Sequence, residues 1–357
     1  MSENRFVTIL IILVFVLSGF IGWHLLSPQG GDKEISINKQ ASILDSVQEN
    51  TVNKEAKMIS SRDSVSITIA SDRSRIDYYE RGTGIAFEVG LNGSLEKALS
   101  STRLPNFLST IWSPNKKEVI SEFAAPGNLK SYSYYNYTTK KSSKLPSGIK
   151  SLAFSPSGDK VAYFKKESDG LFGLFVSAPD GSIPQRIVST RIEDAKLFWP
   201  SKDAISLIST DESQRSSLFL VSMDGKFKKV ISDKSLLSTT WRGDGDSVLV
   251  SYMSEDSQVL SIIDSAVGSE KVLGISADAN ECAWSSSESV VCRISKNSNG
   301  SSLDGGLYDI NIQENSQAFI QGSVGAANGI NEILVDPTNS YIIFTSARDG
   351  KIFSLKR

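Results

Sequence analysis

A hairpin motif recurs about every 43 residues along most of this 357-residue chain. Each copy has an apolar strand that ends in an aromatic residue, then a turn and a second apolar strand. One turn residue marks each copy: Pro114, Pro156, Pro200, Gly243, Ser286 and Pro337. Successive markers are 42, 44, 43, 43 and 51 residues apart. A step of 42 residues back from Pro114 reaches Asp72 in a degenerate copy. Self-similarity at this period indicates a repeat architecture, here with seven units.

Each unit contains four β-like segments joined by short turns. In the third unit, one segment ends at Ser155 and the next three begin at Lys160, Leu171 and Pro184. Four antiparallel strands at this period are typical of a propeller blade. The sequence therefore predicts an all-β fold, a seven-bladed β-propeller of four-stranded antiparallel blades over residues 56–357. The net charge of −2 offers no basic field for nucleic acid.

The ends of the repeat array predict how the ring closes. The seventh unit ends at Arg357 without a fourth strand, whereas an additional strand-like segment precedes the first unit. Its residues 57–60 (KMIS) resemble residues 229–232 (KVIS), a fourth strand at the same distance before its own turn. We expect an N-terminal strand near 56–60 to complete the last blade and remove an open edge.

Five consecutive units carry an aromatic residue two positions before the turn marker. These residues are Trp112, Phe154, Phe198, Trp241 and Trp284. A series of tryptophans can stack against sugars, but an equivalent residue in successive repeats more often packs between neighbouring units. We therefore expect packing between blades.

The N-terminal part of the chain predicts a membrane anchor. Residues 6–26 form an apolar run of 21 residues, long enough to cross the bilayer as a helix. A cleaved signal peptide is the rival interpretation, but the run is longer than a usual signal core and no A-x-A-like site follows it. We expect residues 1–27 to be an uncleaved, single-pass transmembrane signal anchor, preceding the propeller. Residues 28–55 are polar and predict a stalk or linker. This segment forms either a short amphipathic helix or a disordered tether.

The turns resemble a known family. W-S-P at residues 112–114 and F-S-P-S-G at residues 154–158, each followed by an apolar strand, resemble the repeats of TolB-like, WD-repeat-like β-propellers of bacterial envelopes. The resemblance covers roughly residues 56–357. It implies a protein-binding scaffold outside the inner membrane. Arg5 before the apolar run favours a cytoplasmic N-terminus, so the expected location is the inner membrane with a periplasmic propeller.

Histidine is nearly absent, and this restricts the chemistry. The single histidine is His24, inside the apolar run, so neither a Ser-His-Asp triad nor a histidine-ligated metal site can form in the propeller. We expect a non-catalytic, monomeric scaffold without catalytic residues, metal or cofactor, whose partner is an envelope protein or a cell-wall polymer. The alternative is a polysaccharide-active enzyme that uses carboxylates at the channel mouth.

The two cysteines, Cys282 and Cys292, flank the turn of the sixth hairpin symmetrically. Directly opposite positions in antiparallel strands lie close enough for a disulfide. An extracytoplasmic location permits that bond. Two buried thiols that pack as small hydrophobic groups are the alternative.

Candidate ligand or partner residues lie where the repeat is broken. Arg293 and Asp77 place charges at positions that are apolar in other units, which suggests a ligand group in the channel, an internal ion pair or a local misalignment. Tyr132 and Tyr134 share one face of a tyrosine-rich strand and offer either binding surface or packing against a neighbouring blade. The long loop 296–306, with Asn299 and Asp304, is either a binding loop or flexible decoration.

Overall fold

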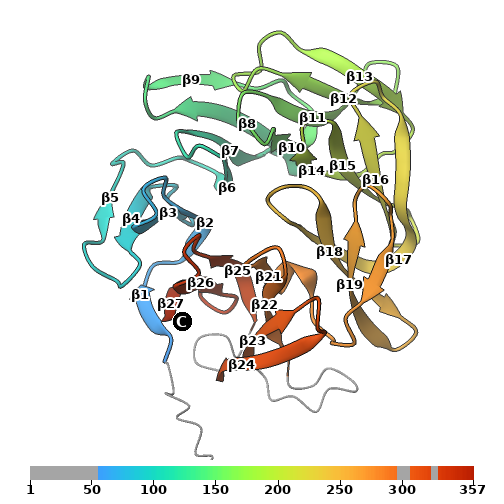
Figure 1. Ribbon diagram of the computed structural model, residues 1–357. Coiled ribbons are helices and arrows are strands. Elements are labelled where there is room, and N and C mark those ends of the chain that lie inside the picture. The colour runs from blue at the N-terminus through green and yellow to red at the C-terminus, as the bar shows by residue number, and fades with distance from the viewer. Residues whose placement is uncertain (1–54, 296–305, 323–328) are drawn as a thin grey trace, which may run out of the picture. The chain divides into compact units, whose positions relative to one another are not determined.

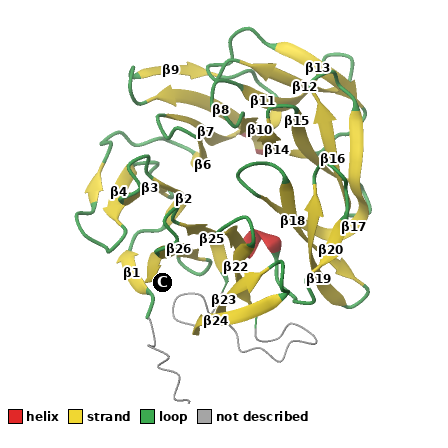
Figure 2. Cartoon of the chain, viewed as in Figure 1, coloured by secondary structure: helices red, strands yellow, loops and turns green. Residues whose placement is uncertain are grey.

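The computed structural model describes residues 55–295, 306–322 and 329–357, all within one compact unit, Asn53–Arg357. These residues form strands and turns almost throughout (Figure 2). Two 3₁₀ turns interrupt them, η1 (Pro126–Asn128) and η2 (Ala279–Glu281). The predicted all-β fold is confirmed. No helix in the described ranges has the length and hydropathy needed to cross a bilayer. The predicted anchor, 1–27, and most of the predicted stalk, 28–55, lie outside those ranges.

Antiparallel four-stranded sheets follow one another along the first half of the described chain. The first contains β2 (Ser64–Ile69), β3 (Arg75–Glu80), β4 (Ala86–Gly90) and β5 (Lys97–Ala98). The second contains β6 (Phe107–Trp112), β7 (Glu118–Ala125), β8 (Leu129–Asn136) and β9 (Lys141–Lys144). The third contains β10 (Ile149–Phe154), β11 (Val161–Lys166), β12 (Phe172–Ser177) and β13 (Gln185–Thr190). The four segments predicted for the third repeat are thus confirmed.

A seven-stranded sheet comes next. It contains β14 (Ala195–Ser201), β15 (Ala204–Thr210), β16 (Arg215–Ser222), β17 (Phe227–Trp241), β18 (Ser247–Ser254), β19 (Ser257–Asp264) and β20 (Glu270–Val272). Strand β17 is 15 residues long: its first part pairs with β16 and its second part with β18. The outer strand of one repeat therefore continues into the inner strand of the next without leaving the sheet.

Two four-stranded sheets complete the described chain. One contains β21 (Cys282–Trp284), β22 (Ser289–Ile294), β23 (Gly306–Asn311) and β24 (Ser316–Gly322). The other contains β25 (Ile330–Val335), β26 (Tyr341–Ser346), β27 (Ile352–Lys356) and, from the N-terminal side, β1 (Lys57–Ser60). Strand β1 pairs antiparallel with β27, with Lys57 opposite Ser354 and Met58 opposite Phe353. The segment that resembled a fourth strand thus lies at the edge of the last sheet, beside β27 (Figure 1).

The serine of the W-S-P and F-S-P turns closes the hairpin. The Ser113 hydroxyl accepts the Glu118 N–H at 3.1 Å, and the Ser155 hydroxyl accepts the Lys160 N–H at 3.1 Å. In the last repeat Asp336 takes this position and accepts the Ser340 N–H at 2.7 Å. All three side chains are buried, so the turn motif satisfies backbone donors that the tight turn would otherwise leave unpaired.

The hydrophobic core lies between successive sheets. Ile120 and Tyr134 of the second sheet pack with Leu152 of the third, and equivalent clusters join the other neighbours. The last sheet packs against the first through a cluster that includes Ile343 and Ile76. Because the last sheet shares a core with the first, the sheets form a closed ring (Figure 1).

The repeated tryptophans form part of these contacts, as predicted. Trp112 donates its indole N–H to the Ser66 carbonyl at 2.8 Å, and Trp284 donates to the Thr240 carbonyl at 3.0 Å. In both cases the acceptor lies on the first strand of the preceding repeat. Phe198 differs from the others because 46% of its surface is exposed.

Candidate functional site: a tyrosine-lined cleft

A cleft of about 370 Å³ opens between the β2–β5 sheet and the β6–β9 sheet. Its aromatic walls come from Tyr79 on β3, Phe123 on β7, Tyr135 on β8 and Tyr137 just after β8. Hydroxyl groups lie between the rings, contributed by Ser100, Thr102, Ser121, Ser133 and Ser142. Aromatic rings with interspersed hydroxyls supply flat apolar contacts together with hydrogen bonds, a combination common at binding surfaces.

The alternation of side chains along β8 places its tyrosines. Successive side chains of a strand point to opposite faces. Ser133, Tyr135 and Tyr137 therefore share the face that lines the cleft, whereas Tyr132 and Tyr134 face the other way. One strand thus supplies both a wall of the cleft and part of the core.

Direct contacts fix the rings at the base of the cleft. The hydroxyls of Tyr79 and Tyr137 lie 2.6 Å apart, within hydrogen-bond distance. The ring of Trp112 stacks on Tyr137 at 5.9 Å between centroids and lies 5.6 Å from Tyr79. Tyr135 meets Tyr137 edge to face at 5.0 Å. Several direct contacts therefore hold the rings of Tyr79 and Tyr137, and Tyr135 is the tyrosine of this cleft whose ring has the fewest such contacts.

Burial decides the protonation of the tyrosines. It raises the pKa of Tyr79 well above its ordinary value and raises the pKa of Tyr137 to about 12. Both hydroxyls therefore stay protonated near neutral pH. They act as hydrogen-bond groups and not as general bases.

Among the described residues, Lys140 is the only charged side chain that lines this cleft. No aspartate or glutamate of the described ranges lines it, so this part of the chain does not place the paired carboxylates of glycoside hydrolysis there. Across the described ranges, no group of three or more His, Cys, Asp or Glu side chains is placed to hold a metal ion. The arrangement suits binding of a polar or anionic chain by stacking and hydrogen bonds.

Tyr132 and Tyr134, selected from the sequence as partner-binding residues, do not lie at the surface. They are 4% and 8% exposed and pack in the core shared with the β10–β13 sheet. The Tyr134 hydroxyl donates to the Glu118 carboxylate at 2.8 Å. The prediction that Tyr132 and Tyr134 form a binding surface is therefore wrong, because both pack in the core. Tyr135 and Tyr137, on the opposite face of the strand, line the cleft.

Asp77 lies on β3, two residues before Tyr79 and on the same face, but it does not line the cleft. It is 8% exposed, and its nearest cation is the Arg75 guanidinium at 3.5 Å. Glu88 on β4 stands opposite Asp77 and binds Arg75 at 2.9 Å, and Asp72 binds Arg75 at 2.6 Å, so three carboxylates share one guanidinium. Burial raises the pKa of Asp77 to about 6, the Arg75 charge opposes this shift and Glu88 adds to it.

This raised pKa predicts a pH-dependent stability. Below about pH 4 Asp77 is protonated in both the folded and the unfolded state. Between about pH 4 and 6 it is still protonated in the folded state but ionised in the unfolded state. Stability from this group therefore falls as the pH rises through that window, by about 2–3 kcal/mol in total. We expect Asp77→Asn to flatten the profile of unfolding free energy against pH between 4 and 7, measured by urea denaturation.

Asp180 provides the matched control of opposite sign, in a turn that shares no ion pair with Asp77. The Ser182 side-chain hydroxyl donates to Asp180 at 2.6 Å and holds the pKa of Asp180 below its ordinary value, so its contribution is present at neutral pH and is lost as the pH falls. Asp180→Asn should therefore reduce stability at pH 7 relative to pH 3. An Asp77→Asn profile parallel to that of the unsubstituted chain would contradict the predicted shift.

Arg293 lies on β22 and is joined to a carboxylate. Its guanidinium donates to Glu281 at 2.7 Å, and the two side chains are 14% and 20% exposed. The other carboxylate oxygen of Glu281 accepts the Ile330 N–H at 3.1 Å. Glu281, the last residue of η2, therefore links Arg293 on β22 to Ile330 on β25 of the next sheet. Of the alternatives for Arg293, this geometry favours the internal ion pair. Asp77 and Arg293 belong to different sheets and do not form one site.

Cys282 on β21 lies directly opposite Cys292 on β22. Their Cα atoms are 4.1 Å apart and their sulfurs form a disulfide. Both residues are buried in the core cluster that also contains Leu249 and Tyr308. The bond therefore joins the first two strands of this sheet across a directly opposite pair.

Asn299 and Asp304 lie outside the described residues. The candidate site thus consists of residues that were not selected from the sequence: Tyr79, Tyr135, Tyr137 and Lys140. The available signal was the second face of the tyrosine-rich strand. Which face is buried depends on where the neighbouring sheet packs, and the strand sequence alone does not encode that.

No family model and no curated protein matches the chain. Among solved structures, it is similar to an oligogalacturonate lyase from Vibrio parahaemolyticus, at 11% identity and a TM-score of 0.63, covering 86% of this chain and 94% of that one. It is also similar to the β-propeller domain of the Trilobed protease from Pyrococcus furiosus, at 13% identity and a TM-score of 0.56, covering 84% and 94%. The β-propeller domain of Cps50 (Swd1) from Myceliophteria thermophila matches at 11% identity and a TM-score of 0.57, covering 85% and 100%.

These likenesses confirm the β-propeller fold. This is the fold that the resemblance of the turn motifs implied. The Trilobed protease domain has an open Velcro topology, whereas β1 pairs with β27 in this chain. At identities near 12% the likeness concerns the fold alone, because one fold supports many activities.

Proposed function

We propose that this protein is a membrane-anchored, extracytoplasmic β-propeller that binds an envelope protein or a cell-wall polymer without catalysis. The apolar run at residues 6–26 supports the anchor, and the polar residues 28–55 support a stalk. Arg5 before the run supports an N-terminus inside and a periplasmic propeller. The anchor is single-pass and the propeller is monomeric in this proposal.

We also propose seven blades for the ring. The β14–β20 sheet counts as two four-stranded blades that share β17. The first part of β17 pairs with β16 as the fourth strand of one blade, and its second part pairs with β18 as the first strand of the next. With the other sheets this gives the number that the repeat spacing predicts. The role of β1 is to close the last blade.

The observation that carries the binding proposal is the cleft between the β2–β5 and β6–β9 sheets. Its tyrosines, serines and single lysine can stack against and hydrogen-bond a polar chain. The lining residues in the described part of the chain include no carboxylate, so a scaffold role is better supported here than a carboxylate-based polysaccharide enzyme. Lys140 favours partners with acidic groups.

Tyr135 gives the test, because its ring can be removed without breaking the Tyr79–Tyr137 contact. We expect Tyr135→Ala to weaken binding of the full chain by at least about tenfold, which is typical of losing one aromatic anchor. Co-sedimentation with purified cell-wall sacculi of the source organism measures binding to a cell-wall polymer. A photo-crosslinking amino acid at position 135 in intact cells measures binding to an envelope protein.

Phe227 is the matched control, an exposed aromatic residue on β17 far from the cleft in the sequence. Phe227→Ala should leave sacculus binding unchanged, and a crosslinker at position 227 should set the background. The proposal would be contradicted if substitutions at positions 135 and 227 changed sacculus binding equally and crosslinkers at the two positions gave equal yields.

A further inference from the structure

A hydrogen bond that recurs between sheets is missing at Trp241. Trp112 and Trp284 occupy the same place in their repeats and donate to a carbonyl of the preceding repeat at 2.8 and 3.0 Å. The Trp241 indole nitrogen is buried and has no hydrogen-bond partner among the described residues. The side chain is 7% exposed. The contact between the two parts of the seven-stranded sheet therefore differs from its counterparts.

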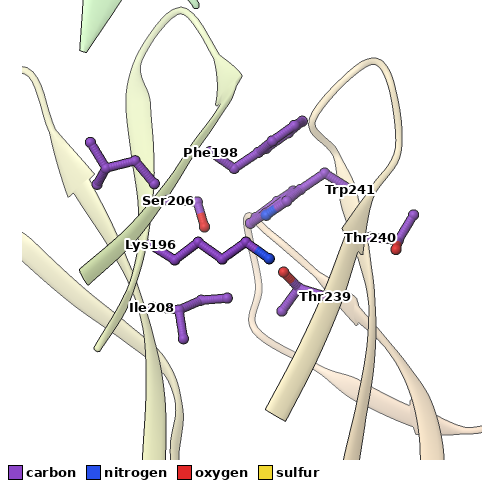
Figure 3. A pocket seen from close by; sticks show the side chains of 8 residues that line it. Lys196, Phe198, Ser206, Ile208, Thr239, Thr240 and Trp241 are labelled. Atoms are coloured by element: carbon purple, nitrogen blue, oxygen red, sulfur yellow. The ribbon is translucent and has the colours of Figure 1, made fainter. Parts of the chain in front are cut away.

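A cavity of about 280 Å³ lies at this place. Lys196 and Phe198 on β14, with Ser206 and Ile208 on β15, form one side, and Thr239 and Trp241 on β17 belong to the other. Figure 3 shows Ser206 between Phe198 and Lys196, and the Lys196 side chain extending toward Thr239. The cavity is therefore lined by the first strands of two neighbouring repeats and by β15, and it is open to solvent on the side of Lys196 and Phe198.

Ser206 lines the same cavity and carries a second unpartnered donor. Its hydroxyl is buried, the residue is 1% exposed, and it makes no hydrogen bond to a described residue. The position six residues after the turn marker is apolar in five other units, where it is Ile120, Ala162, Leu249, Cys292 and Ile343. A buried hydroxyl without a partner costs about 1–3 kcal/mol. A bound acceptor would remove that cost at both Ser206 and Trp241.

Charge and shape define the acceptor. Lys196 is exposed and forms no ion pair within the described ranges, and no acidic residue lines the cavity. The Phe198 and Trp241 rings are parallel, 6.3 Å apart between centroids, and with Ile208 they give apolar walls. One cation and two neutral donors match the two oxygens of a carboxylate. The volume lies just below the roughly 300–1,000 Å³ of drug-sized sites, so the apolar body is small.

We propose that this cavity binds a small carboxylic acid with an apolar body. Its carboxylate accepts from Lys196, Ser206 and Trp241, and its body packs on Phe198 and Ile208. The same chemistry occurs in a free organic acid and in the C-terminal residue of a peptide. This site is separate from the tyrosine-lined cleft, so either one can fail without the other.

The experiment uses the full chain labelled with 5-fluorotryptophan and titrated with phenylacetate, observed by ¹⁹F NMR. The Trp241 resonance, assigned through its loss in Trp241→Phe, should shift saturably while the Trp112 resonance stays in place. Phenylacetamide, which lacks the charge, should bind at least tenfold more weakly. Binding of N-acetylphenylalanine with equal strength identifies a peptide terminus as the source, and its failure beside phenylacetate binding identifies a free acid.

Substitution of the exposed Lys196 tests the proposal even if Trp241→Phe does not fold. Lys196→Gln should weaken phenylacetate binding about tenfold, and Lys150→Gln, an exposed lysine on β10, should not change it. Ser206→Val should abolish binding while raising the thermal unfolding midpoint. The proposal is overturned if no tryptophan resonance shifts saturably, if phenylacetamide binds as well as phenylacetate, or if Lys196→Gln binds like the unsubstituted chain.

Discussion

Ile59→Asp should lower the free energy of unfolding by about 3–5 kcal/mol. Ile59 belongs to β1, is 7% exposed, and packs with Ile352 of β27 and Tyr78 of the first sheet. Loss of an isoleucine side chain from such a site costs about 2–3 kcal/mol, and a buried carboxylate adds to this. The measurement is urea denaturation of the full chain at pH 7.

Met58 is the matched control on the same strand. It is adjacent to Ile59 but 47% exposed, so Met58→Asp should change the free energy of unfolding by less than about 1 kcal/mol. Amide hydrogen exchange adds a local readout, because Ile59→Asp should release β1 and speed exchange along Ile352–Lys356. Equal stability of the two variants would mean that β1 does not hold the last sheet in solution.

Glu281→Ala should lower the free energy of unfolding by about 2–3 kcal/mol. The substitution removes the acceptor of both the Arg293 guanidinium and the Ile330 N–H. Loss of one partner of a buried ion pair costs about 3–5 kcal/mol, and the partial exposure of both side chains reduces this figure. Urea denaturation at low and high salt measures the effect.

A double-mutant cycle with Arg293→Met isolates the ion pair. We expect the double variant to be more stable than the sum of the single effects predicts, with a coupling of at least about 1 kcal/mol. Asp224→Ala serves as the control, because the Asp224–Lys226 pair is exposed and should not contribute measurably. Additive effects of Glu281→Ala and Arg293→Met would show that Arg293 gains its stability from another group.

The turns show how local sequence predicts local structure. Ser113 and Ser155 accept backbone N–H groups five residues ahead, so the interaction that closes each turn lies within the motif. A pattern that is satisfied inside one hairpin can be read from the hairpin alone. The pairing of β1 with β27 spans nearly the whole described chain, yet its strand was recognisable because the repeat gave a copy for comparison.

The tyrosine strand shows where that reasoning stops. Alternation along β8 separates Tyr132 and Tyr134 from Tyr135 and Tyr137, but it assigns neither pair to the core. The neighbouring β10–β13 sheet covers the first pair. Ser206 was a missed signal of another kind, since comparison of the position six residues after each turn marker reveals it as polar among apolar equivalents.

The sequence by itself determined the repeat, the strand pattern and the segment that pairs with the last sheet, because these depend on spacing and on contacts within one hairpin. The tertiary structure decided which side chains form the tyrosine-lined cleft, which cation pairs with Glu281, and where a tryptophan lacks its acceptor. Each of these depends on the distance between side chains of neighbouring sheets. That distance is set by how the sheets pack, and residues far apart in the chain contribute to it jointly.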